Sequence, residues 1–150
     1  MKKLFGILSL SVITFGCCSN IDCADGRAIL NFSYLSQDGD DLLNGQFKKY
    51  DVTDINIYSI EPSGSKQFLN IEFKTEQGSP SVGSGVFTTL NDRWFVELTG
   101  TLTDTLDIKF KTNDGGCCGV QTWIDTLDLN GIDTSLGLYG SEILNVVERN

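Results

Sequence analysis

Short runs in which apolar and polar residues alternate dominate the chain beyond residue 26. The clearest runs place apolar side chains at every second position: 69, 71 and 73; 94, 96 and 98; and 106, 108 and 110. Successive side chains of a β-strand point to opposite faces of a sheet, so each run predicts a strand with one buried face and one solvated face. No stretch of a dozen residues beyond the first sixteen has a helical period. The sequence therefore predicts an all-β fold.

Clusters of Gly, Asn, Asp, Ser and Pro separate these runs and mark the turns. We expect strands at residues 27–35, 54–60, 67–74, 85–90, 93–99, 105–111, 120–129 and 142–148. Asn130-Gly131 is the strongest hairpin signal, because a type I′ turn needs positive φ at both positions. Seven or eight strands favour a single antiparallel β-sandwich over residues 27–150, either immunoglobulin-like or transthyretin-like. The alternative is a small lipocalin-like barrel with an internal cavity.

The first sixteen residues have the order of a secretory signal. Lys2 and Lys3 precede an apolar run that ends at Phe15, and Gly16 follows it. The run is shorter than the roughly 20 apolar residues that span a membrane. We therefore expect residues 1–16 to be a leader, and the polar, turn-rich residues 17–26 to be a tether.

Gly16-Cys17 resembles the cleavage site of a bacterial lipoprotein, in which the cysteine receives a diacylglyceryl group and becomes the mature N-terminus. Thr14 and Phe15 depart from the Leu and the Ala or Ser that are usual there. The resemblance implies that fatty acid such as palmitate anchors the chain at Cys17. It also favours the outer membrane, because Cys18 stands where an Asp would indicate retention in the inner membrane. Ordinary secretion, with cleavage near Gly16 or Ser19, is the alternative.

Several short segments of the remaining chain carry a second resemblance. They are GDDLLNG (39–45), YDVTDINIYSI (50–60), TDTLDIKFK (103–111), CC (117–118) and LDLNG (127–131). Together they are similar to a class of small lipoproteins from Bacteroidota-type bacteria. The resemblance implies an exported β-sandwich and adds no catalytic residue.

The mature chain is strongly acidic. Loss of residues 1–16 removes two lysines and no acid, leaving nine basic and twenty acidic residues and a formal charge of −11. Nucleic-acid binding depends on Lys and Arg that neutralise phosphates, so we expect no nucleic-acid partner. The expected contacts are the membrane, through the lipid, and an unknown protein or component of the cell envelope.

Four cysteines remain if Cys17 is acylated: Cys18, Cys23, Cys117 and Cys118. An exported chain meets an oxidising compartment, where such a set usually pairs. Typical disulfides join Cα atoms about 4.4–6.8 Å apart, whereas neighbouring Cα atoms lie about 3.8 Å apart. We therefore favour one bridge from Cys23 to Cys117 or Cys118. Free thiols, or a functional thiol or metal site, are the alternatives.

The absence of histidine limits the chemistry that the chain can perform. It excludes Ser-His and Cys-His nucleophilic pairs and histidine-containing zinc sites, so an enzyme would need paired carboxylates or a lysine. Three acids of the loop at residues 36–45 are weak calcium candidates: Asp38, Asp40 and Asp41. The calcium-loop pattern fails because Leu42 and Leu43 occupy the places after Asp40 where the pattern needs Asp or Asn and then Gly, and no Glu stands where the bidentate ligand belongs. We expect neither a metal nor a cofactor.

These observations favour a membrane-anchored lipoprotein that is not an enzyme. We expect a binding, adhesion or accessory module of the cell envelope. A small-ligand carrier, if the fold is a barrel, and a carboxylate-dependent hydrolase are the alternatives.

Overall fold

The computed structural model describes residues 26–98, 103–114, 116–134 and 143–148. Within these ranges the chain forms ten strands, three short 3-10 helices and no α-helix. The strands are β1 (Ile29–Leu35), β2 (Ile55–Ile60), β3 (Lys66–Phe68), β4 (Ile71–Lys74), β5 (Val82–Val86), β6 (Arg93–Leu98), β7 (Thr103–Asn113), β8 (Gln121–Leu129), β9 (Ile132–Asp133) and β10 (Leu144–Val147). The 3-10 helices are η1 (Gly45–Phe47), η2 (Val52–Asp54) and η3 (Gly116–Cys118). The predicted all-β class is confirmed.

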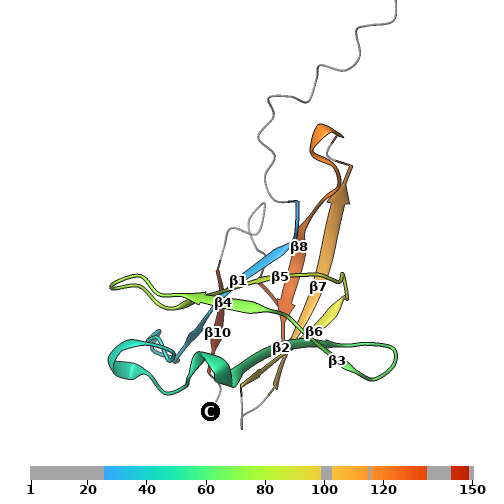
Figure 1. Cartoon of the computed structure of the whole chain (residues 1–150). Helices are drawn as coiled ribbons and strands as arrows, with labels where there is room; N and C mark the ends of the chain where they lie inside the picture. Colours follow the sequence, from blue (N-terminus) through green and yellow to red (C-terminus); the bar gives the residue numbers. More distant parts are fainter. Residues whose placement is uncertain (1–25, 99–102, 115, 135–142, 149–150) are drawn as a thin grey trace, which may run out of the picture.

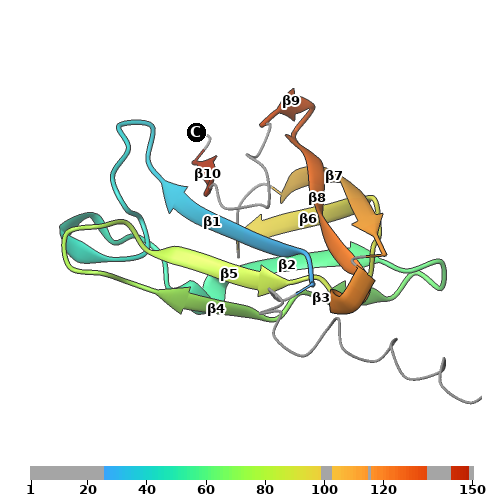
Figure 2. The same cartoon turned by 90° about the horizontal axis from the view of Figure 1, so that it is seen from above.

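The strands form two sheets, as the sandwich prediction requires (Figures 1 and 2). The smaller sheet has the order β10-β1-β5-β4, and the larger has the order β3-β2-β6-β7-β8-β9. Each sheet keeps two edge strands, so the lipocalin-like barrel is wrong. The pairing is antiparallel as predicted, except that β10 runs parallel to β1. None of the described segments is a helix of the length and apolarity needed to cross a membrane.

The core lies between the two sheets and uses the predicted alternation. Trp94, Val96 and Leu98 of β6 are buried as expected, and Leu106 and Ile108 of β7 pack beside them. The smaller sheet contributes residues of β1 that sequence periodicity also places inward, namely Leu30, Phe32 and Tyr34. Phe87 completes the centre, with its ring edge-on to Trp94 at 4.9 Å and to Phe110 at 5.2 Å.

The predicted strand at residues 67–74 is two strands in different sheets. β3 pairs with β2 in the larger sheet, and β4 pairs with β5 in the smaller one. The chain crosses between the sheets at Leu69-Asn70, where the amide of Leu69 donates to the carbonyl of Ile57 at 2.7 Å. The apolar alternation at residues 69, 71 and 73 begins at the crossover, and alternation does not show which sheet a strand joins.

The strand predicted at residues 85–90 lies earlier, at Val82–Val86. The prediction missed its start because the two inward positions of this strand are glycines, which show no apolar alternation. An added Cβ at Gly83 would lie 2.5 Å from the ring of Phe32, and one at Gly85 would lie 2.6 Å from Leu69. Aromatic and aliphatic side chains of the neighbouring strands fill the space that β5 leaves. A glycine strand of this kind carries no apolar periodicity, although glycine in a strand often marks close approach of neighbouring groups.

The Asn130-Gly131 hairpin is confirmed. Asn130 has φ 54° and Gly131 has φ 79°, as a type I′ turn requires, and they join β8 to the two-residue strand β9. The side chain of Asn130 also accepts a hydrogen bond from the amide of Thr105 at 2.9 Å and donates one to buried Asp104 at 2.8 Å. The hairpin tip is therefore attached to β7.

Candidate functional site

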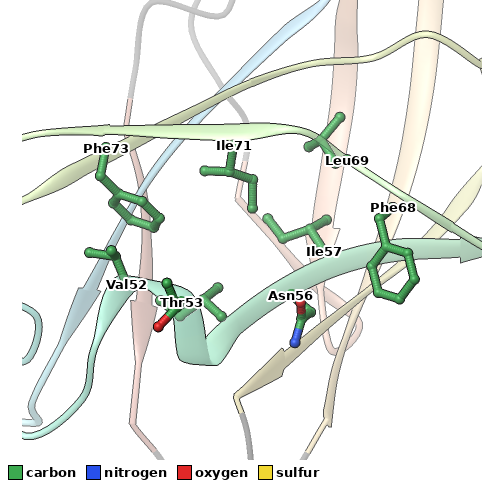
Figure 3. Close-up of a pocket in the computed structure, with 9 residues that line it drawn as sticks. Val52, Thr53, Asn56, Ile57, Phe68, Leu69, Ile71 and Phe73 are labelled. Atoms are coloured by element: carbon green, nitrogen blue, oxygen red, sulfur yellow. The ribbon is translucent and has the colours of Figure 1, made fainter.

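A groove lies at one side of the sandwich, between η2 and β2 on one wall and β4 on the other, and seven of its nine lining residues are apolar (Figure 3). We call it the edge groove; it has a volume of about 330 Å³ and is lined by Val52, Thr53, Ile55, Asn56, Ile57, Phe68, Leu69, Ile71 and Phe73. For comparison, a cavity of about 150 Å³ in a protein core accommodates benzene. The edge groove is therefore large enough for about two apolar side chains.

Three elements hold the walls of the edge groove. Ile71 and Phe73 point from β4 toward Val52 and Ile57 on the opposite wall (Figure 3). The wall at Val52 is set by η2, where Asp51 and Asp54 form a reciprocal capping box. The crossover at Leu69 closes one end, because its amide is bonded to β2.

The apolar walls are only partly covered by the chain itself. Phe68 is 57% exposed and Val52 is 40% exposed. Ile71 and Phe73 are half-buried, although they face the core side of β4. Phe73 is fixed in place by an edge-on contact with the buried ring of Phe32, at 5.6 Å. Apolar side chains that the described residues leave exposed in a concave site are a common feature of binding surfaces.

A row of aromatic rings extends from the edge groove across the outer face of the larger sheet. Phe68, Tyr58 and Phe95 lie on three adjacent strands, with centroids 5.7 and 5.4 Å apart. The ammonium of Lys66 lies 3.8 Å from the centre of the Tyr58 ring and 2.9 Å from a carboxylate oxygen of Glu97. The pair raises the pKa of Lys66 and lowers the pKa of Glu97, chiefly through their hydrogen bond.

The strand beside the edge groove, β4, is an edge of the smaller sheet. It pairs with β5 and with no other strand in the described part of the chain. Glu72 and Lys74 point away from the core and are exposed. Neither makes an ion pair with another described residue. This strand therefore offers an open row of backbone groups flanked by one acid and one base.

The calcium candidates have structural roles in the loop after β1. Asp41 accepts hydrogen bonds from the amide and hydroxyl of Ser81, at 2.8 and 3.0 Å, and from the amide of Leu43 at 2.9 Å. The amides of Asp38 and Asp40 donate to the hydroxyl of Ser36. Within the described ranges, no three His, Cys, Asp or Glu side chains gather as metal ligands would.

Several acids form ion pairs at the surface. Arg93 makes two hydrogen bonds to Asp107, at 2.6 and 3.0 Å, and these lower the pKa of the Asp107 carboxyl. Hydrogen bonds from Lys49 and Tyr50 lower the pKa of Glu148. A catalytic general acid needs the opposite shift, toward neutral pH. The first pair joins β6 to β7, and the second joins the segment after η1 to the residue after β10.

The predicted cysteine sites lie mostly outside the described residues, as Cys17, Cys18 and Cys23 do. Cys117 and Cys118 lie in η3, at the turn between β7 and β8, and neither is a free thiol. The carbonyl of Gly26 accepts a hydrogen bond from the amide of Thr122 at 2.7 Å, so the start of the described chain lies against the segment after η3. The bridge from Cys23 to Cys117 or Cys118 stays a prediction.

Sequence reasoning missed the edge groove. Its lining residues come from η2, β2, β3, the crossover and β4, and the position of the crossover brings them together. One sequence feature could have indicated it: Phe68 falls between the alternating positions 69, 71 and 73, where a polar residue is expected. An aromatic residue at such a position points to an exposed apolar surface.

Comparison with known proteins adds no family or relative. No protein-family model matches the chain, and no significant match was found among curated proteins or solved structures.

Proposed function

We propose that the chain is a membrane-anchored binding module of the cell envelope that is not an enzyme, and that the edge groove is its binding surface. The observation that carries the proposal is the edge groove itself: about 330 Å³, lined largely by apolar side chains and left open by the described residues. The signal-like residues 1–16 and Cys17 supply the anchor, and residues 17–26 supply the tether. The outer membrane is the membrane that the lipoprotein resemblance favours.

A protein partner suits this surface better than a small ligand. The edge groove is an open cleft at the edge of two sheets, whereas a carrier needs a site that encloses most of its ligand. It also lies beside the open backbone edge of β4, and an exposed strand edge is a place where another chain can add a strand. The surface ion pairs of Asp107 and Glu148 give no support to the hydrolase alternative.

The anchor is tested by fatty-acid labelling of the full chain. Labelled palmitate should be incorporated into the wild-type protein, and Cys17→Ser should abolish that incorporation, because the acceptor sulfur is lost. Cys18→Ser is the matched control and should keep the label. Labelling that persists in Cys17→Ser would refute the site.

The binding surface is tested by photo-cross-linking in intact cells. A benzophenone amino acid replaces Phe68 at the edge groove. As a control it replaces Ile132, which is 69% exposed and lies on β9, at the opposite edge of the larger sheet. We expect a light-dependent protein adduct from position 68 and none from position 132. No adduct at position 68, or equal adducts at both positions, would contradict the edge groove as the binding surface.

A further inference from the structure

Among the described residues, no strand lies beside the free edge of β4 to cover its core side. At the opposite edge of the same sheet, the inward residues of β10 are already covered, since Leu144 is 3% and Val146 is 1% exposed. The corresponding residues of β4, Ile71 and Phe73, are only half-buried and open into the edge groove. A further strand beside β4 would cover them and extend the smaller sheet.

The charges on the outer face of β4 are self-complementary. Directly opposed residues of an antiparallel pair lie on the same face of the sheet, and the side chains of such a pair interact. If two copies of β4 pair about a two-fold axis at Phe73, Glu72 lies opposite Lys74 of the partner subunit. Lys74 likewise lies opposite Glu72 of the partner subunit, so both outward pairs are attractive.

The neighbouring registers are unfavourable. Moving the axis to Glu72 places the two copies of Glu72 opposite each other, and moving it to Lys74 does the same for the two lysines. A shift by a single residue would place inward residues opposite outward ones, which the pleat forbids. Only the register centred on Phe73 combines opposite charges outside with apolar contact inside.

We propose that the occupant of the edge groove is a second copy of this chain, which adds its own β4 antiparallel to the first. The inference deepens the proposed function, on which it rests, by naming the partner of the same surface. The inward side chains of each β4 then meet across the axis, Phe73 against Phe73 of the partner subunit, and cover the mouth of the groove. The contact uses the same patch on both copies, so it closes as a symmetric dimer.

The test is sedimentation of the full chain carrying Cys17→Ser, so that no lipid holds copies together. We expect a concentration-dependent dimer. Glu72→Lys or Lys74→Glu alone turns both attractive pairs into repulsive ones and should raise the dissociation constant about 10- to 100-fold. The double exchange Glu72→Lys with Lys74→Glu restores both attractive pairs and should restore the dimer. Lys109→Glu, an equal charge change on the exposed face of β7 in the other sheet, should leave the dimer unchanged.

The outcomes separate the two proposals. A wild-type chain that stays monomeric at all concentrations, or single variants that dimerise as well as wild type, would overturn the dimer. If the dimer fails while position 68 still cross-links to a protein of different mass, the binding surface stands and its partner is another protein. Circular dichroism and urea unfolding of each variant exclude misfolding as the cause of lost association.

Discussion

At the scale of single residues, the glycines of β5 determine how closely the core can pack. Gly83 and Gly85 lie on the inward face, where Phe32, Phe73 and Leu69 take the space that side chains would otherwise occupy. The edge-on contact of Phe32 with Phe73 depends on this arrangement, and Phe73 forms one wall of the edge groove. The absence of a side chain at Gly83 therefore helps to shape the edge groove.

Gly83→Ala tests this account. The added methyl would lie 2.5 Å from the fully buried ring of Phe32, so the ring would have to shift. We expect the free energy of unfolding to fall by about 1–3 kcal/mol, the usual cost of overpacking a core. Urea unfolding monitored by tryptophan fluorescence measures it.

Ser84→Ala, between the two glycines and on the other face of β5, is the matched control. It should change the free energy of unfolding by no more than about 0.5 kcal/mol. Equal stability of Gly83→Ala and wild type would show that the core around Phe32 is looser than the structure indicates.

At the scale of elements, the alternation of apolar and polar residues predicted the strands that are buried on one face. It did not predict where the chain passes from one sheet to the other. β1, β2, β6, β7 and β8 lie within a few residues of their predicted ranges. The division of the run at 67–74 was missed because alternation does not show which sheet a strand joins. The predicted range of β5 was wrong because its inward positions, Gly83 and Gly85, carry no side chains. Side chains of the neighbouring residues fill that part of the core instead.

The same limit explains why the site could not be predicted. Val52 lies in η2 and Phe73 lies in β4, twenty-one positions later, and no local pattern connects them. The acids of residues 36–45 were considered as a cluster because they are close in sequence. The fold instead directs Asp41 to Ser81, forty positions away, as a hydrogen-bond acceptor.

The turn between β7 and β8 supports a prediction about the cysteines. Gly26 is hydrogen-bonded to Thr122, and three peptide units connect Cys23 to Gly26, which span at most about 11 Å. Cys118 precedes Thr122 by four residues, so η3 is about as close in sequence to this hydrogen bond as Cys23 is. This geometry favours a bridge from Cys23 to Cys117 or Cys118.

Peptide mapping without reduction tests the bridge. Cys23→Ser should leave one additional thiol in η3 open to alkylation, and should lower the free energy of unfolding by about 2–5 kcal/mol through loss of the cross-link. Alkylation of both Cys117 and Cys118 in the unreduced wild-type protein would contradict the bridge.

At the scale of the whole molecule, the two sheets differ in how well their edges are completed. The larger sheet ends in β3 and β9, which have three and two residues, and such short strands offer little to another chain. The smaller sheet ends at β4 with apolar side chains still half-exposed and with a groove beneath them. This edge gives the molecule one surface that is suited to adding a strand from a second copy.

The most direct measurement of this claim is the molar mass of an equimolar mixture of the Glu72→Lys and Lys74→Glu chains, obtained by light scattering. Each variant alone opposes like charges and should have the mass of one chain. In the mixture, both outward positions of β4 meet the opposite charge, so the account predicts a heterodimer with twice that mass. A mixture that keeps the mass of a single chain would contradict the account.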